Sequence, residues 1–273
     1  MTKRTLDRGI LETVGEQLAV PASNATANNI TVFATRWGFG GLVIEPAAAL
    51  RWQLTPKIHS IFLYDVSAAV GSRWKNLQGN ANGLLDRHVA GDTSTLLDSM
   101  QTGDKIYIGT QRPHGGFSVD MDASAVNGNA STLTLKYSKS DNTFASQAIT
   151  DGTITVATKT LSGDGNITLD AIPTDWVEDD LKVLTGLTQM DLPNRRLYWV
   201  ELSISAALSA DVEIEKVISM SQRASGATLG GGYMKANVEY TLNFSDDAGG
   251  LQLMAQAASS TTANVSWLKR DPE

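Results

Sequence analysis

Strict alternation of apolar and polar residues, interrupted by short turn sequences, constrains this chain more than any other feature. In Gly116–Asp122 every second residue is apolar, so one face of an extended segment is apolar and the other polar. Ser131–Tyr137 repeats the pattern, and Asn127–Asn129 between the two segments is a strong turn signal. This arrangement predicts antiparallel strands that place one face on a core and the other in solvent.

Similar β-favouring segments recur along the chain and are separated by turns rich in Gly, Asn and Asp. They are Ile30–Thr35, Leu42–Glu45, Lys57–Val66, Asp104–Gly109, Ile154–Leu161, Ile167–Leu169, Leu197–Ser205, Asp211–Val217 and Tyr233–Phe244. Charged residues make up only 19% of the chain, which is low for a protein built of long surface helices. We therefore expect a mainly β protein with one antiparallel β-sandwich over residues 57–222.

The two ends of the chain lack a long hydrophobic pattern of their own. We expect residues 1–56 to form an extended N-terminal arm with appended strands, and residues 223–273 to form a C-terminal β-hairpin extension. The Gly-rich stretch Gly226–Gly232 would act as the connector to this extension. Because a lone hairpin is marginally stable in water, the extension should dock on the main domain or on another subunit.

Composition narrows the classes of function. The chain has no cysteine, which excludes disulfides, thiolate zinc sites and cysteine nucleophiles, and fits synthesis in a reducing cytoplasm. It carries 29 acidic and 22 basic residues, and the basic ones are scattered, so we expect no nucleic-acid partner. No run of 18 apolar residues occurs, so no membrane-spanning helix is expected.

Two residue sets are candidate metal ligands. The three histidines are far apart in the sequence: His59, His88 and His114. Oxygen-bearing residues alternate across one turn and superficially resemble a calcium site: Asp164, Asn166, Thr168 and Asp170. This set lacks the glycine and glutamate that an EF-hand loop needs, and solvated turn residues are the simpler interpretation. We predict neither a metal nor another cofactor.

No catalytic signature stands out. A nucleophile elbow of the form Gly-x-Ser-x-Gly is absent, and Gly226–Gly232 lacks the Lys-Ser/Thr ending of a phosphate-binding loop. The neighbouring carboxylates Asp179 and Asp180, like Asp246 and Asp247, lie in polar turns. A hydrolase would need carboxylates that converge in a cleft. We therefore predict that the protein is not an enzyme.

Aromatic residues divide into two groups. Trp176 and Trp199 lie in or beside the best β pattern, so we assign them to core packing. Other large aromatics lie in less regular parts of the chain, where they are candidates for a subunit interface. These candidate interface residues are Trp37, Trp52, Trp74, Tyr233 and Trp267.

The middle of the chain, roughly residues 104–218, resembles a group of virion proteins of tailed bacteriophages. The residues that carry the likeness are Tyr107–Gly109, Arg112-Pro113, Gly116–Asp120, Ser131–Tyr137, Asp151–Thr153, Lys159–Leu161, Pro173–Trp176, Tyr198–Leu202 and Ser205–Ser209. Two positions depart from the pattern of that group. His114 stands where an aromatic residue often follows the proline, and Glu201 stands where an arginine is common.

The resemblance implies a jelly-roll-like sandwich in a virion assembled in the host cytoplasm. Such proteins serve as capsid decoration or cement proteins, or as parts of the tail or baseplate. We expect a homo-oligomer, with a trimer favoured, whose partners are other virion proteins such as the major capsid protein. A carbohydrate- or receptor-binding β-sandwich, with a glycan as partner, is the alternative. An acidic outer protein is not attracted to a packaged genome, in keeping with this expectation.

Overall fold

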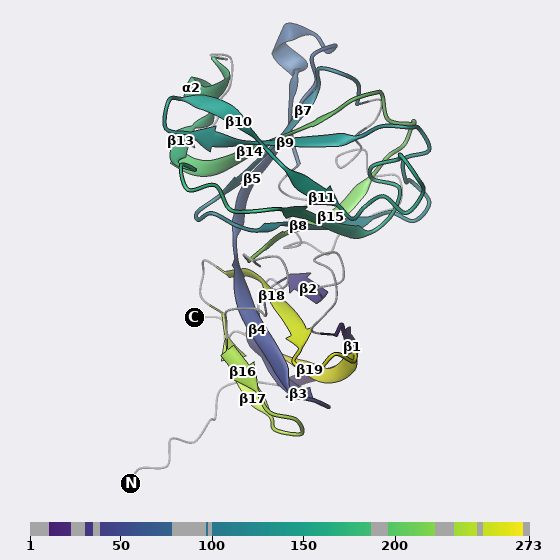
Figure 1. Ribbon diagram of the computed structural model, residues 1–273, viewed down its shortest axis with the longest axis vertical. Coiled ribbons are helices and arrows are strands. Elements are labelled where there is room, and N and C mark those ends of the chain that lie inside the picture. Colours follow the sequence, from purple (N-terminus) through teal and green to yellow (C-terminus); the bar gives the residue numbers. More distant parts are fainter. Residues whose placement is uncertain are drawn as a thin grey trace.

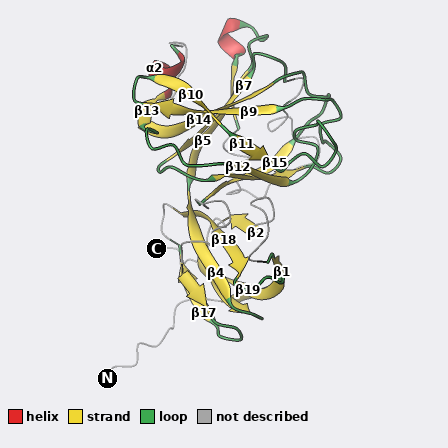
Figure 2. Ribbon diagram, in the orientation of Figure 1, coloured by secondary structure: helices red, strands yellow, loops and turns green. Residues whose placement is uncertain are grey.

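A computed structural model of the chain describes residues 11–22, 31–34, 39–77, 97, 100–186, 196–221, 232–244 and 248–269. Nearly all of the regular structure in these residues is β-strand, and all strand pairs are antiparallel (Figure 2). The described helical segments are short: the 3₁₀ turn η2 (Val70–Ser72) and the α-helix α2 (Leu181–Thr185). The predicted mainly β class is therefore confirmed.

The largest sheet is seven-stranded, with the order β10–β9–β14–β7–β5–β6 and with β13 paired to β14 beside this path. Its strands are β5 (Ile58–Tyr64), β6 (Trp74–Asn76), β7 (Lys105–Thr110), β9 (Leu133–Lys139), β10 (Thr143–Gln147), β13 (Glu178–Asp180) and β14 (Arg196–Ile204). Beneath it lies the β8 sheet, of order β11–β12–β8–β15. Its strands are β8 (Gly116–Met121), β11 (Ile149–Asp151), β12 (Gly165–Leu169) and β15 (Ile214–Met220).

These two sheets form what we call the central sandwich, and they share one hydrophobic core (Figure 1). Ile106 and Ile108 of β7 face Phe117 and Val119 of β8 within the same cluster of buried residues. The alternation seen in the sequence explains this core, because every second residue of each strand points inward.

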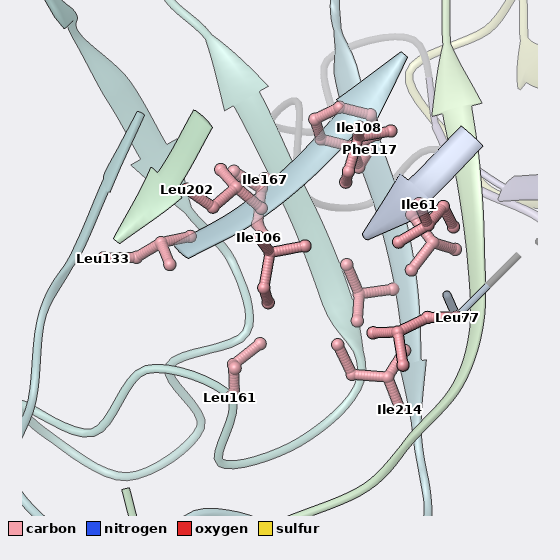
Figure 3. Close-up of a pocket in the computed structure, with 12 residues that line it drawn as sticks. Ile61, Leu77, Ile106, Ile108, Phe117, Leu133, Leu161, Ile167, Leu202 and Ile214 are labelled. Atoms are coloured by element: carbon pink, nitrogen blue, oxygen red, sulfur yellow. The ribbon is translucent and has the colours of Figure 1, made fainter. Parts of the chain in front are cut away.

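A small apolar cavity of about 20 Å³ lies between the two sheets. Figure 3 shows its lining residues pointing toward one another from both layers, among them Ile106, Phe117, Ile167 and Leu202. The lining is entirely aliphatic or aromatic. The space is large enough for one water molecule, but its apolar lining offers no hydrogen-bond partner to retain one, so we interpret it as a packing defect of the core.

The two ends of the chain build a second body, which we call the terminal sandwich. One of its sheets, the β19 sheet, has the order β1–β19–β3–β17, and the other, the β18 sheet, has the order β16–β4–β18–β2. The strands are β1 (Leu11–Val20), β2 (Thr31–Ala34), β3 (Phe39–Pro46), β4 (Leu50–Pro56), β16 (Gly232–Met234), β17 (Tyr240–Asn243), β18 (Ala248–Ala255) and β19 (Thr261–Lys269).

This arrangement corrects the prediction of a separate N-terminal arm and a C-terminal hairpin. Strand β19 pairs with β1 and β3, and β18 pairs with β2 and β4, so each sheet contains strands from both ends of the chain. The physical reason is burial: Leu42 and Ile44 share a core with Leu251, Leu253 and Val265. Neither end has enough apolar faces to close a core alone, and pairing the ends supplies the missing layer.

The two sandwiches are stacked so that β15 lies against β18, β4 and β2. Ser221 donates from its hydroxyl to the carbonyl of Leu54 at 2.7 Å, and its backbone N–H donates to Oε1 of Gln252 at 2.9 Å. The hydroxyl of Ser219 donates to the carbonyl of Pro56. The chain crosses the same junction between β4 and β5, and the result is an elongated stack with the seven-stranded sheet at one end (Figure 1).

Candidate functional site

The outer face of the seven-stranded sheet is turned away from the terminal sandwich (Figure 1). We call it the distal face and define it by Phe62, Tyr64, Trp74, Lys105, Tyr107, Lys136, Phe144 and Glu201. The strand register brings these residues together from different strands. Phe62 lies opposite Tyr107, Tyr107 opposite Glu201, and Glu201 opposite Lys136. Residues from β5, β7, β14 and β9 therefore form one transverse row.

An aromatic row runs over this face. The ring centroid of Tyr64 lies 4.8 Å from that of Trp74, and Trp74 lies 5.6 Å from Tyr107. The next ring, Phe144, lies 5.7 Å from Tyr107. Tyr107 is buried at the centre of the row, whereas Tyr64, Trp74 and Phe144 are half-buried. The row therefore offers partly exposed rings to solvent on both sides of a buried one.

A charged network adjoins the aromatic row. The side chain of Glu201 is 7% exposed, and its Oε1 lies 2.7 Å from Nζ of Lys105 and 3.4 Å from Nζ of Lys136. The hydroxyl of Tyr107 donates to the other carboxylate oxygen at 3.2 Å. Burial, reinforced by the negative charge of Glu201, raises the pKa of Tyr107 well above its usual range. The phenol thus stays protonated at physiological pH and acts as a donor.

A close approach between β7 and β14 fixes further side chains on this same face. Gly109 of β7 has no side chain, and Leu197 and Trp199 of β14 occupy the space above it: a Cβ built there would lie 2.7 Å from Leu197 and 2.8 Å from the indole. The Nε1 of Trp199 donates to the carbonyl of Asp179 at 2.9 Å. The indole is thereby fixed beside Phe62, at a centroid distance of 6.4 Å.

The structure places the candidate interface residues in different surroundings. Trp74 belongs to the distal face, and Trp52 is half-buried against the core of the terminal sandwich. Tyr233 is 44% exposed, with the guanidinium of Arg51 5.5 Å from its ring centroid. Trp267 is 5% exposed and packs beside Phe244, which leaves little surface for a partner. Trp37 lies outside the described residues.

The core assignment of Trp176 and Trp199 is confirmed, since both are buried. His114 is buried beside Trp176, with ring centroids 5.0 Å apart, and its Nδ1 accepts from the N–H of Gly116 at 3.2 Å. This bond places the proton of the neutral ring on Nε2. Burial lowers the pKa of His114 to about 3, so the ring is neutral at physiological pH.

The other candidate ligands are dispersed. His59 is half-buried in β5, and His88 lies outside the described residues. Of the alternating oxygen set, Asp164 accepts from the N–H of Met121 at 2.8 Å, Asn166 and Thr168 are buried in β12, and Asp170 is exposed. Within the described ranges, no group of three or more His, Cys, Asp or Glu side chains is placed to hold a metal ion.

The carboxylate pair Asp179 and Asp180 has a structural role. Asp180 caps α2 by accepting from the N–H of Lys182 at 2.9 Å, and Asp179 accepts from the N–H of Asp180 at 2.8 Å. The second pair, Asp246 and Asp247, lies outside the described residues. Among the helices of the described part, none has the length and apolar character to cross a membrane.

Searches against protein-family models, curated proteins and solved structures found no match. Sequence reasoning named Trp74 but missed Tyr64, Lys105, Lys136 and Phe144. The alternation of the strands could have indicated the lysines, because Lys105 and Lys136 each follow or precede a buried residue of β7 or β9 and so point to the opposite, outer face of the sheet.

Proposed function

We propose that this chain is a non-enzymatic structural component of a bacteriophage particle, and that it acts as a decoration or cement protein on the head shell. The stacked architecture is the observation that carries the proposal. Two sandwiches joined through Ser219, Ser221 and Gln252 make an elongated spacer, and the distal face lies at one end of it. Such a spacer suits a protein that must hold its contact surfaces in fixed positions within an assembly.

Three further observations support this role. The likeness of residues 104–218 to virion proteins implies jelly-roll connections in the central sandwich, which we include in the proposal. The net charge of −7 disfavours attraction to a packaged genome. Strands β1 and β17 lie at the two edges of the β19 sheet, and sheet edges are natural sites for contact with another chain. The proposal includes self-association, with a trimer favoured.

Particle composition tests the location. Mass spectrometry of purified virions should detect the chain in a fixed ratio to the major capsid protein, and immunogold labelling should decorate the head. Labelling of the tail would instead indicate that the chain is a tail or baseplate component. Particles that lack the chain altogether would refute a virion role.

A carbohydrate- or receptor-binding module is the second candidate. The observation that favours it is the aromatic row formed by Tyr64, Trp74, Tyr107 and Phe144, because partly exposed rings on a sheet can stack against sugar rings.

A further inference from the structure

The charges on the distal face do not balance. Two ammonium groups, those of Lys105 and Lys136, share one carboxylate oxygen of Glu201, and the second oxygen accepts from Tyr107. The lysine side chains are 26% and 38% exposed. An ammonium group has three donors, so each lysine retains donors for a ligand after its contact with Glu201. The network therefore carries one excess positive charge on a protein whose net charge is −7.

Hydroxyl groups lie in the same part of the sheet. Oγ1 of Thr134 and Oγ of Ser203 are 2.7 Å apart on neighbouring strands, and the Thr134 residue is exposed. Ser203 follows Glu201 by two residues on β14, and Thr134 precedes Lys136 by two on β9, so all four point to the same face. The distal face thus combines stacking surfaces, hydroxyl groups and an excess cation.

We propose that the distal face binds an acidic oligosaccharide. The C–H face of one sugar ring would stack on the half-buried rings of Tyr64 and Trp74, and a uronate or similar sugar carboxylate would pair with Lys136 and Lys105. A few convergent polar groups beside an apolar surface are the usual composition of such a site. Charge complementarity selects an acidic sugar over a neutral one, because Glu201 neutralises only one of the two lysines.

This inference rests on the second candidate function, carbohydrate binding, and is independent of a place in a virion. Its test uses the isolated full chain, so failure to bind sugar leaves the particle experiments unaffected. The probes are hexamers of galacturonate and of glucuronate, their fully methyl-esterified forms, and a hexaglutamate peptide. Binding is measured by calorimetry and by tryptophan fluorescence at low and at physiological salt.

The proposal expects at least one acidic hexamer to bind, and expects its methyl ester to bind at least tenfold more weakly. Affinity should fall as salt increases. The Lys136→Gln variant should weaken binding about tenfold, the usual effect of losing one charge-assisted hydrogen bond. Trp74→Leu should also weaken it. Lys216→Gln is the matched control, since Lys216 pairs with Asp120 at the same distance of 3.4 Å on another sheet, and it should leave affinity unchanged.

Three results would overturn the proposal. The first is that neither acidic hexamer binds at millimolar concentration, and the second is that the acid and its methyl ester bind equally well. The third is that hexaglutamate binds as tightly as the acidic hexamers, which would indicate that the face binds an acidic protein instead of a sugar. The acid–ester comparison needs no variant, so it decides the question even if Trp74→Leu fails to fold.

Discussion

Acid should destabilise this protein through one buried histidine. The imidazole of His114 is fully buried, and its pKa falls to about 3, whereas an unfolded chain titrates near its ordinary value of 6.5. Below pH 6.5 the unfolded state therefore binds a proton that the folded state does not. The stabilisation of the folded state that comes from keeping His114 neutral is therefore complete above pH 6.5, and it is lost as the pH falls toward 3. The loss is about 2 kcal/mol at pH 5 and about 4 kcal/mol at pH 3.

The variant His114→Asn tests this reasoning, because the amide oxygen can still accept from the N–H of Gly116 while nothing titrates at the site. Its smaller side chain should lower stability by the same amount at every pH. Urea unfolding between pH 7 and pH 5 should show the wild type losing about 2 kcal/mol more than the variant, since the carboxylates titrate in both. Parallel curves for the wild type and His114→Asn would refute the argument.

Three stability predictions follow from the packing. Gly109→Ala should lower the free energy of urea unfolding by about 2 kcal/mol, because the added Cβ would lie 2.7 Å from Leu197. Gly128→Ala is the control: its nearest atom would lie 3.7 Å away, so the free energy of unfolding should change by less than about 0.5 kcal/mol. Equal effects of the two variants would contradict the close approach at Gly109. Thr158→Gly should stabilise the folded protein by about 1 kcal/mol, because Thr158 is an exposed β-branched residue with φ of +65°, a backbone conformation that glycine adopts without strain. A lower melting temperature of the variant would contradict this prediction. Val217→Ile should raise the melting temperature by adding about 0.8 kcal/mol of burial in the core cavity, and a clear fall would show that the cavity cannot take a methyl group.

Alternation predicted the strands at β5, β7, β8, β9, β12, β14 and β15, because it fixes both the extended conformation and the buried face. It did not predict the shorter strands β6, β10, β11 and β13. Ile154–Leu161 is the instructive error, since its β-branched residues favoured a strand but the segment is a series of turns. The hydroxyl of Ser162 accepts from the N–H of Thr155 at 2.9 Å, and Leu161 has φ of +55°. Side-chain hydrogen bonds to the local backbone offered an alternative to a β-ladder, and the pattern of apolar residues in the sequence does not reveal such bonds.

The terminal sandwich and the distal face were not predicted for a different reason. Pairing β1 with β19 joins residues from opposite ends of the chain, and no local pattern encodes such a partner. The network around Glu201 likewise depends on the register of β7, β9 and β14. A one-residue slip in that register would move each lysine to the other face. The chemistry of the face becomes visible only when the order of the strands is known.

The most direct test of the structural role is the mass of the protein in solution, measured by light scattering with and without purified head shells. The proposal predicts a defined oligomer, with a trimer favoured, that co-sediments with the shells and raises their melting temperature. A monomer that neither sediments with the shells nor stabilises them would contradict it.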